Sequence, residues 1–149
     1  MRAAALASAV IVLDQATKQL ASSALDSGER VSLVLGFELA DVRNTGIAFG
    51  LLSDGQGVVI AVTLAALALV LAYFARDPSR RGMWIAVGLL AGGAIGNLAD
   101  RVREDEVIDF FDPPLWPAFN VADIAIVAGI ATLLLVQLAD AGDGEPPRA

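Results

Sequence analysis

The sequence contains no cysteine and no histidine. Without cysteine, the chain can form no disulfide, no thiolate nucleophile and no Cys-ligated metal site. Without histidine, it lacks the Ser-His-Asp and Cys-His catalytic arrangements and the His-based zinc sites. Acid–base chemistry near neutral pH must therefore come from carboxylates, from the single lysine, Lys18, or from the single tyrosine, Tyr73. We accordingly expect no catalytic metal held by cysteine or histidine.

Charged residues are also scarce, at 18% of the 149 residues, whereas hydrophobic residues make up 56%. With a mean hydropathy of +0.67, the chain is too apolar for a soluble domain of this length. It has no basic stripe, which argues against nucleic acid as a partner. The composition predicts an integral-membrane protein that forms a single domain over residues 1–149.

Apolar segments long enough to span a membrane recur along the chain. The clearest, residues 57–75, carries no charge and is close to the ~20 residues that a helix needs to cross a ~30 Å hydrocarbon core. The third segment has glycines spaced by four, at Gly88, Gly92 and Gly96, a stripe that favours close helix packing. The polar segment 140–149 is expected to be disordered. We predict spans at about residues 3–25, 57–75, 83–99 and 120–138.

The first apolar segment has two interpretations. Its basic start at Arg2, short apolar run and Ser22-Ser23-Ala24 would fit a cleaved signal peptide. However, it is long enough to span, and it holds Asp14 and Lys18 one helical turn apart. Such a pair inside a membrane helix is costly unless it faces protein or water, so it is either a functional-site candidate or a pair that fixes this helix to its neighbours.

The segment between the first two spans differs from them in its periodicity. Apolar residues alternate with small or polar ones over residues 31–39, which predicts a half-buried strand. A turn signal follows at Arg43 to Gly46, and an apolar patch at 47–50 is expected at the lipid interface. The fold class we predict is an all-α membrane protein with four transmembrane helices and a small extracytoplasmic β-sheet between helices 1 and 2.

The distribution of charge predicts the orientation. Arg2 and the basic turn 76–81 lie on one side of the predicted spans, and the acidic loops 26–56 and 101–118 lie on the other. Because lysine and arginine mark the cytoplasmic side, we expect both termini in the cytoplasm and the acidic loops outside.

A near-repeat places acids and amides together in these loops. Asn97-Leu98-Ala99-Asp100 and Asn120-Val121-Ala122-Asp123 each put an amide and a carboxylate on one helix face, and Asp109 lies between them in an apolar run. Two carboxylates that share a proton can activate a water and protonate the leaving nitrogen of a peptide bond. The symmetry of the repeat favours Asp100 as the partner of Asp123. The apolar surroundings of Asp109 and the absence of an adjacent cation favour Asp109, because we expect Asp100 to stay ionised through an ion pair with the adjacent Arg101.

The chain resembles the lipoprotein signal peptidases (signal peptidase II), integral-membrane aspartic peptidases. The resemblance rests on five ordered blocks: Asp14-Gln15-x-Thr17-Lys18, Arg43-Asn44-x-Gly46-x-Ala48-Phe49-Gly50, Gly92-Gly93-Ala94-x-Gly96-Asn97-x-x-Asp100-Arg101, Val107-x-Asp109-Phe110 and Pro117-x-Phe119-Asn120-x-Ala122-Asp123. Two features depart from the family pattern. The linker between Asp109 and Asp123 is a few residues shorter than usual, and Ala99 stands where a larger aliphatic residue is common.

The resemblance implies a monomer in the bacterial cell (inner) membrane, in contact with membrane lipid. It implies cleavage of lipid-modified prolipoproteins just before the diacylglyceryl-modified cysteine, without metal or cofactor, at the extracytoplasmic face. It also implies that Asp109 and Asp123 are catalytic. The residues that it implies shape the site or bind substrate are Asp14, Lys18, Asn44, Gly46, Asn97, Asp100, Arg101 and Asn120.

The main alternative is a small proton-coupled transporter or channel component, with Asp14, Lys18, Asp100 and Asp123 as a relay. A relay should place acids at several depths of the bilayer, whereas here they gather toward one face and the second span has none. A helix-packing subunit built on the glycine stripe would leave the acids unexplained.

Overall fold

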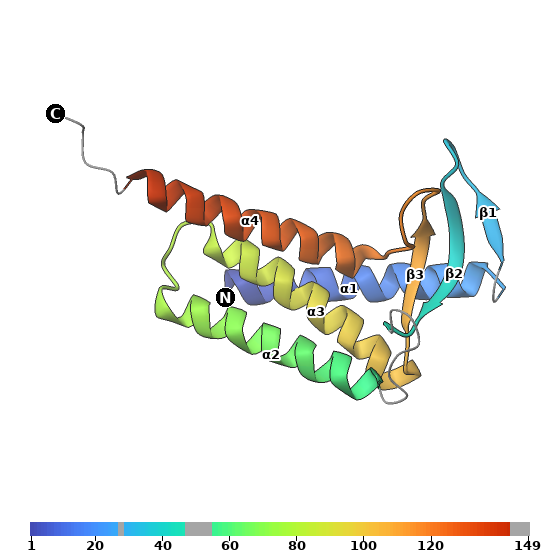
Figure 1. Cartoon of the computed structure of the whole chain (residues 1–149), viewed down its shortest axis with the longest axis horizontal. Helices are drawn as coiled ribbons and strands as arrows, with labels where there is room; N and C mark the ends of the chain where they lie inside the picture. Colours follow the sequence, from blue (N-terminus) through green and yellow to red (C-terminus); the bar gives the residue numbers. More distant parts are fainter. Residues whose placement is uncertain (27–28, 47–54, 144–149) are drawn as a thin grey trace.

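The computed structural model describes residues 1–26, 29–46 and 55–143. Four helices lie alongside one another, and a small sheet covers one end of the bundle (Figure 1). The N-terminus and the C-terminal end of the last helix lie at the opposite end (Figure 1). The elements, in order, are α1 (Arg2–Ala24), β1 (Arg30–Ser32), β2 (Glu38–Asn44), α2 (Gly55–Arg76), α3 (Met83–Glu104), β3 (Val107–Asp112) and α4 (Val121–Asp143).

Among the described residues, three helical segments are long and apolar enough to cross a membrane: Gln56–Arg76, Met83–Glu104 and Val121–Asp140. Helix α1 has 23 residues but is not one of them, because Asp14 and Lys18 interrupt its apolar sequence. Both side chains are buried, with exposed fractions of 0% and 1%, so the polar pair faces protein. The predicted helical architecture is confirmed, and a fourth span through α1 stays a prediction.

The glycines of α3 let it pack closely on both α1 and α4. A Cβ added at Gly92 would lie 2.7 Å from Cβ of Val10, and one added at Gly93 would lie 2.4 Å from the carbonyl oxygen of Ala122. Neither distance is possible for a real side chain, so any larger residue would push the helices apart. In the described part of the chain, α2 makes close backbone contact with α3 alone.

The sheet is antiparallel, with the order β1-β2-β3. Its third strand comes from the segment between α3 and α4, so the prediction that the sheet lies between helices 1 and 2 was incomplete. The first four residues of β3 are all buried, and such a strand shows no alternation in its sequence. Val42 is paired with Asp109 in the register. The short linker then forms a bridge between Phe111 and Phe119, which returns the chain to α4.

The single strand predicted over residues 31–39 is wrong. The chain reverses inside this stretch, where the amide of Leu33 donates to the carbonyl of Phe37 at 2.7 Å. Leu35 and Gly36 have φ of 60° and 80°, the left-handed conformation that such a turn requires. Leu35 is 90% exposed, so the alternation does not mark a buried face.

Two other expectations concern segments that the structure does not describe in full. The predicted interface patch, residues 47–50, lies outside the described residues, and so does the terminal part of the predicted disordered tail, residues 144–149. The start of that tail is helical, because α4 continues to Asp143.

Candidate active site

Asp109 lies in β3 with its side chain inside the protein, 1% exposed. Its Oδ1 accepts a hydrogen bond from Nδ2 of Asn120 at 2.6 Å, and its Oδ2 accepts one from Nδ2 of Asn44 at 2.8 Å. Burial and, to a smaller extent, the charge of Asp123 raise the pKa of Asp109 to about 6, against the lowering effect of the hydrogen bonds from Asn44 and Asn120. A carboxyl with this pKa can carry a proton close to neutral pH.

Asp123 lies in the first turn of α4 and is fixed by reciprocal hydrogen bonds with Asn120. Oδ1 of Asn120 accepts from the amide of Asp123 at 3.0 Å, and Oδ2 of Asp123 accepts from the amide of Asn120 at 3.2 Å. These bonds form a capping box at the start of α4. The other oxygen, Oδ1, accepts from Nδ2 of Asn97 at 2.8 Å.

Asn120 connects the two acids to α3. Its side chain is fully buried, and its Nδ2 lies within hydrogen-bond distance of both Asp109 and Oδ1 of Asn97, the latter at 3.1 Å. The same residue caps α4 and so places Asp123. One amide therefore sets the position of Asp109 relative to Asp123.

Lys18 lies at the centre of a second group of contacts behind these acids. Its Nζ is 2.8 Å from Oδ2 of Asp14, 2.6 Å from Oδ2 of Asp100 and 2.9 Å from Oδ1 of Asn97. The contact with Asp100 is an ion pair that lacks the alignment of a hydrogen bond.

The expected pairing of Asp100 with Arg101 is wrong. Consecutive residues of a helix point about 100° apart, so Asp100 faces Lys18 while Arg101 donates to the carbonyl of Asn97 at 3.4 Å. The lysine that neutralises Asp100 comes from another helix. The conclusion that Asp100 is ion-paired holds, but the partner is different.

Asp14 has a second contact that the sequence did not indicate. Its Oδ1 accepts from the backbone amide of Ala122, in the first turn of α4, at 2.9 Å. Asp14 therefore holds the helix end that carries Asp123, in addition to pairing with Lys18.

Gln15 was missed as a site residue. Its Nε2 donates to Oδ1 of Asp100 at 2.7 Å, and it accepts from Arg103 through Oε1 at 2.9 Å. Gln15 belongs to the first of the five sequence blocks on which the resemblance rests. Its place in that block is the signal that could have identified it as a site residue.

Gly46 forms the turn that orients Asn44. Its φ is 71°, and its amide donates to Oδ1 of Asn44 at 2.8 Å, which leaves Nδ2 of Asn44 to reach Asp109. A Cβ at Gly46 would lie 3.3 Å from Arg101. The structure thus brings all ten predicted site residues into one connected cluster: Asp14, Lys18, Asn44, Gly46, Asn97, Asp100, Arg101, Asp109, Asn120 and Asp123. Within the described ranges, no group of three or more acidic side chains is arranged to hold a metal ion.

Two mainly apolar grooves meet at Asp123. The first, of about 500 Å³, lies between α2, α3 and α4 and has Asn97, Arg101 and Asp123 among its lining residues. The second, of about 430 Å³, lies along α4 and is lined by Trp116, Phe119 and Asp123 together with aliphatic residues of that helix. An apolar substrate lying in either groove would come into contact with this carboxylate.

Comparisons with known proteins agree on one family. The sequence model of signal peptidase (SPase) II matches residues 6–139. A lipoprotein signal peptidase from Pelotomaculum thermopropionicum is 42% identical over 133 residues, covering 88% of both chains. One from Moorella thermoacetica is 39% identical over 140 residues and covers 93% of both.

The fold comparison gives the same class of protein. Two solved structures of bacterial membrane enzymes match with TM-scores of 0.85, at 27% and 29% identity. The match covers 99% and 93% of this chain, respectively, and 93% of each solved chain. This multi-pass membrane protein belongs to the signal peptidase II family.

Proposed function

We propose that this protein removes signal peptides from lipid-modified prolipoproteins, cutting just before the lipid-modified cysteine, and that it does so as an aspartic peptidase. The observation that carries the catalytic assignment is that Asn120 links two acids in unlike surroundings, Asp109 and Asp123. Asp109 is buried and has a raised pKa, and Asp123 lies where two apolar grooves meet. The relatives named lipoprotein signal peptidase support the reaction and the substrate class.

The environments of the two acids support different roles for them in the proposed reaction. Asp109 holds the proton and polarises the scissile carbonyl, whereas Asp123, held at the start of α4 by the capping box, takes a proton from the attacking water. As the tetrahedral intermediate collapses and its C–N bond breaks, Asp123 passes the proton that it took from water to the leaving nitrogen. The hydrogen bonds from Asn44, Asn97 and Asn120 hold both carboxylates in place through these transfers.

The grooves fit the chemistry of such a substrate. A prolipoprotein presents an apolar signal segment and the acyl chains of its modified cysteine, and both need apolar surface close to the scissile bond. The two grooves at Asp123 offer separate apolar surfaces on either side of α4. A proton-coupled transporter is not favoured, because Asp14, Asp100 and Asp123 belong to one connected cluster and α2 contains no acidic residue.

The reaction can be tested directly with purified protein in detergent. A diacylglyceryl-modified prolipoprotein should be converted to a faster-migrating product, and mass spectrometry should find the new N-terminus at the modified cysteine. The matched control is the same prolipoprotein without the lipid, which we expect to remain uncut. Absence of product from the lipidated substrate would overturn the proposed activity.

We also propose that the sheet and the acid cluster face the outside and that both termini are cytoplasmic. Reporter fusions after Ala75 and after Ala139 should read cytoplasmic, and fusions near Gly55 should read external. A fusion after Asp26 should also read external if α1 spans the membrane. An external signal at Ser79 would reverse the orientation and remove the site's access to exported substrates.

The pH dependence of cleavage follows from the raised pKa of Asp109. The active form carries one proton on the pair, so kcat/KM should fall at acidic pH, when both carboxyls are protonated, and also above about pH 6, when the proton of Asp109 is lost. The acidic and the alkaline limb of the profile both reflect the coupled titration of the two carboxyls. A flat profile in a chemistry-limited assay would argue against a carboxylate dyad.

The hydrogen bond from Asn44 to Asp109 allows the contribution of Asp109 to the alkaline limb to be tested. Asn44 stabilises the ionised form of Asp109, so Asn44→Ala should move that limb to higher pH by roughly 0.5–1 unit. Thr45→Ala, at the neighbouring exposed position, is the control and should leave the limb unchanged.

A further inference from the structure

The groove between α2, α3 and α4 follows one face of α2 and one face of α4. Its lining residues on these two helices recur with helical periodicity: Val62, Thr63, Ala66, Leu67 and Val70 on α2, and Asp123, Ile126, Ile130 and Leu133 on α4. One turn beyond the last of them, the same faces carry Tyr73 on α2 and Gln137 on α4. The end of the groove far from Asp123 is therefore bordered by polar side chains.

Arg80, from the loop of residues 77–82, joins these two side chains. It donates to the hydroxyl of Tyr73 at 2.5 Å and to Oε1 of Gln137 at 2.9 Å. Gln137 in turn donates to the same hydroxyl, and Arg80 also forms an ion pair with Asp140 of α4. We call Tyr73, Arg80, Gln137 and Asp140 the clasp.

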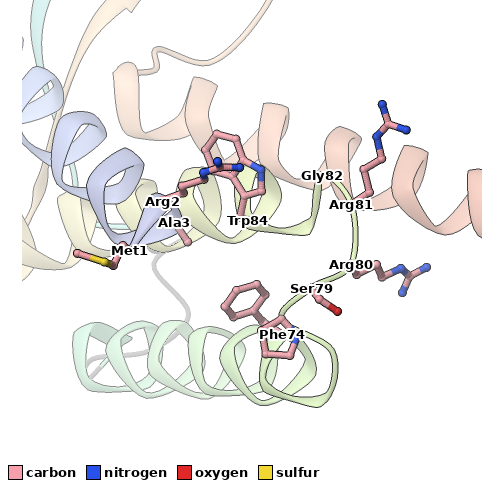
Figure 2. Close-up of a pocket in the computed structure, with 10 residues that line it drawn as sticks. Met1, Arg2, Ala3, Phe74, Ser79, Arg80, Arg81, Gly82 and Trp84 are labelled. Atoms are coloured by element: carbon pink, nitrogen blue, oxygen red, sulfur yellow. The ribbon is translucent and has the colours of Figure 1, made fainter.

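The loop that carries Arg80 lies against α4. After α2 ends, the chain runs toward α4 before α3 begins (Figure 1). Figure 2 shows the Arg80 side chain pointing away from Met1 and Arg2 at the start of α1. Gly82 has a φ of 81°, and a Cβ there would lie 3.1 Å from Cγ2 of Val136. The loop is thus packed on the helix that Arg80 contacts.

Helix α2 is the least enclosed wall of the groove. None of its described residues is buried, and it makes close backbone contact with α3 but not with α4. Within the described residues, every hydrogen bond or ion pair that joins α2 or its following loop to α4 involves Arg80 or Tyr73. A helix with few buried contacts shifts easily, and polar side chains are a common means of holding membrane helices together. The separation of α2 and α4 therefore depends on the clasp.

We infer that the clasp sets the distance between α2 and α4 and thereby the width of the groove that leads to Asp123. Arg80 is then a positioning residue for the peptidase, because it neither lines the groove nor contacts the acids. The consequence for cleavage rests on the proposed function, in which this groove takes an apolar part of the substrate. A wider groove loses contacts in the ground state and the transition state alike, so KM rises while kcat changes little.

The distance can be measured directly, because the chain has no cysteine of its own. Spin labels on Leu69→Cys of α2 and Leu135→Cys of α4 are exposed and lie outside the groove lining. In double electron–electron resonance, Arg80→Gln should give a longer mean distance and a broader distribution than the labelled parent. An unchanged distribution would overturn the inference.

Arg81→Gln is the matched control for this measurement. It removes the same charge from the next position of the loop, but Arg81 is exposed and makes no ion pair or side-chain hydrogen bond in the described part of the chain. Its distance distribution should equal that of the parent. A change as large as that in Arg80→Gln would assign the effect to loop charge and not to the clasp.

The kinetic measurement uses the unlabelled protein and a lipidated prolipoprotein. Arg80→Gln should raise KM roughly tenfold, on the order of one lost charge-assisted hydrogen bond, and should change kcat per folded molecule by less than about twofold. A purely structural arginine would lower the folded fraction and leave KM unchanged, so an unchanged KM would overturn the positioning role. If the wild type cleaves no prolipoprotein, the proposed function fails, whereas the distance comparison still decides the clasp.

Tyr73→Phe decides the inference if Arg80→Gln does not fold. This change removes one hydroxyl, which accepts from both Arg80 and Gln137, and keeps the aromatic ring. The distance and KM should shift in the same direction as expected for Arg80→Gln, by smaller amounts. Parental values of both in folded Tyr73→Phe would contradict the inference.

Discussion

Asp109→Asn and Asp123→Asn are each expected to lower turnover by at least about 10³-fold. Asparagine has almost the same shape as aspartate, but it can neither hold the shared proton nor take one from water. Substrate binding should persist, because the grooves at Asp123 remain. The change at Asp109 also places an amide opposite two donors, Asn44 and Asn120, so folding must be checked by thermal unfolding.

Asp100→Asn is the matched comparison for this prediction. Asp100 is bound to Lys18 and Gln15 and lies behind the pair, so its loss should reduce the yield of folded protein and leave residual turnover per folded molecule. Turnover of all three variants should be normalised to the folded fraction. If folded Asp100→Asn were inactive while Asp109→Asn remained active, the dyad would be Asp100 with Asp123, as the symmetry of the repeat suggested.

Lys18→Met is expected to cause the largest loss of stability, on the order of 3–5 kcal/mol, since it removes one partner of a buried charge network. Methionine fills much of the same volume, but Asp14 and Asp100 would remain buried without their cation. Asp14 also holds the amide of Ala122, so the start of α4 and the position of Asp123 should be disturbed. Unfolding in a detergent titration measures the loss.

Two further variants test whether charge is the cause. Adding Asp100→Asn to Lys18→Met removes one of the two uncompensated carboxylates and should recover part of the stability. Thr17→Val is the local control, because the Thr17 hydroxyl bonds only to backbone carbonyls of its own helix, and it should be nearly neutral. A Lys18→Met protein as stable as the wild type would show that the network is not a structural requirement.

The sequence by itself determined those relations that depend on spacing within one element. Asp14 and Lys18 are four residues apart on a helix, so they meet whatever the rest of the chain does. Asn120 and Asp123 are three apart at a helix start, which produces the capping box. The membrane class and the glycine stripe of α3 were visible for the same reason, because composition and periodicity are local properties.

The tertiary structure decided every relation between elements. Asp100 and Asp123 both end an Asn-x-Ala-Asp sequence, yet their surroundings differ. Asp100 contacts Lys18 of α1, whereas Asp123 lines the apolar grooves. Only the packing of α3 on α1 determines which of the two carboxylates faces the lysine. The pairing of β3 with β2 likewise placed Asp109 beside Asn44. Contacts between distant segments depend on how closely helices and strands approach one another, and spacing along the chain carries no measure of that distance.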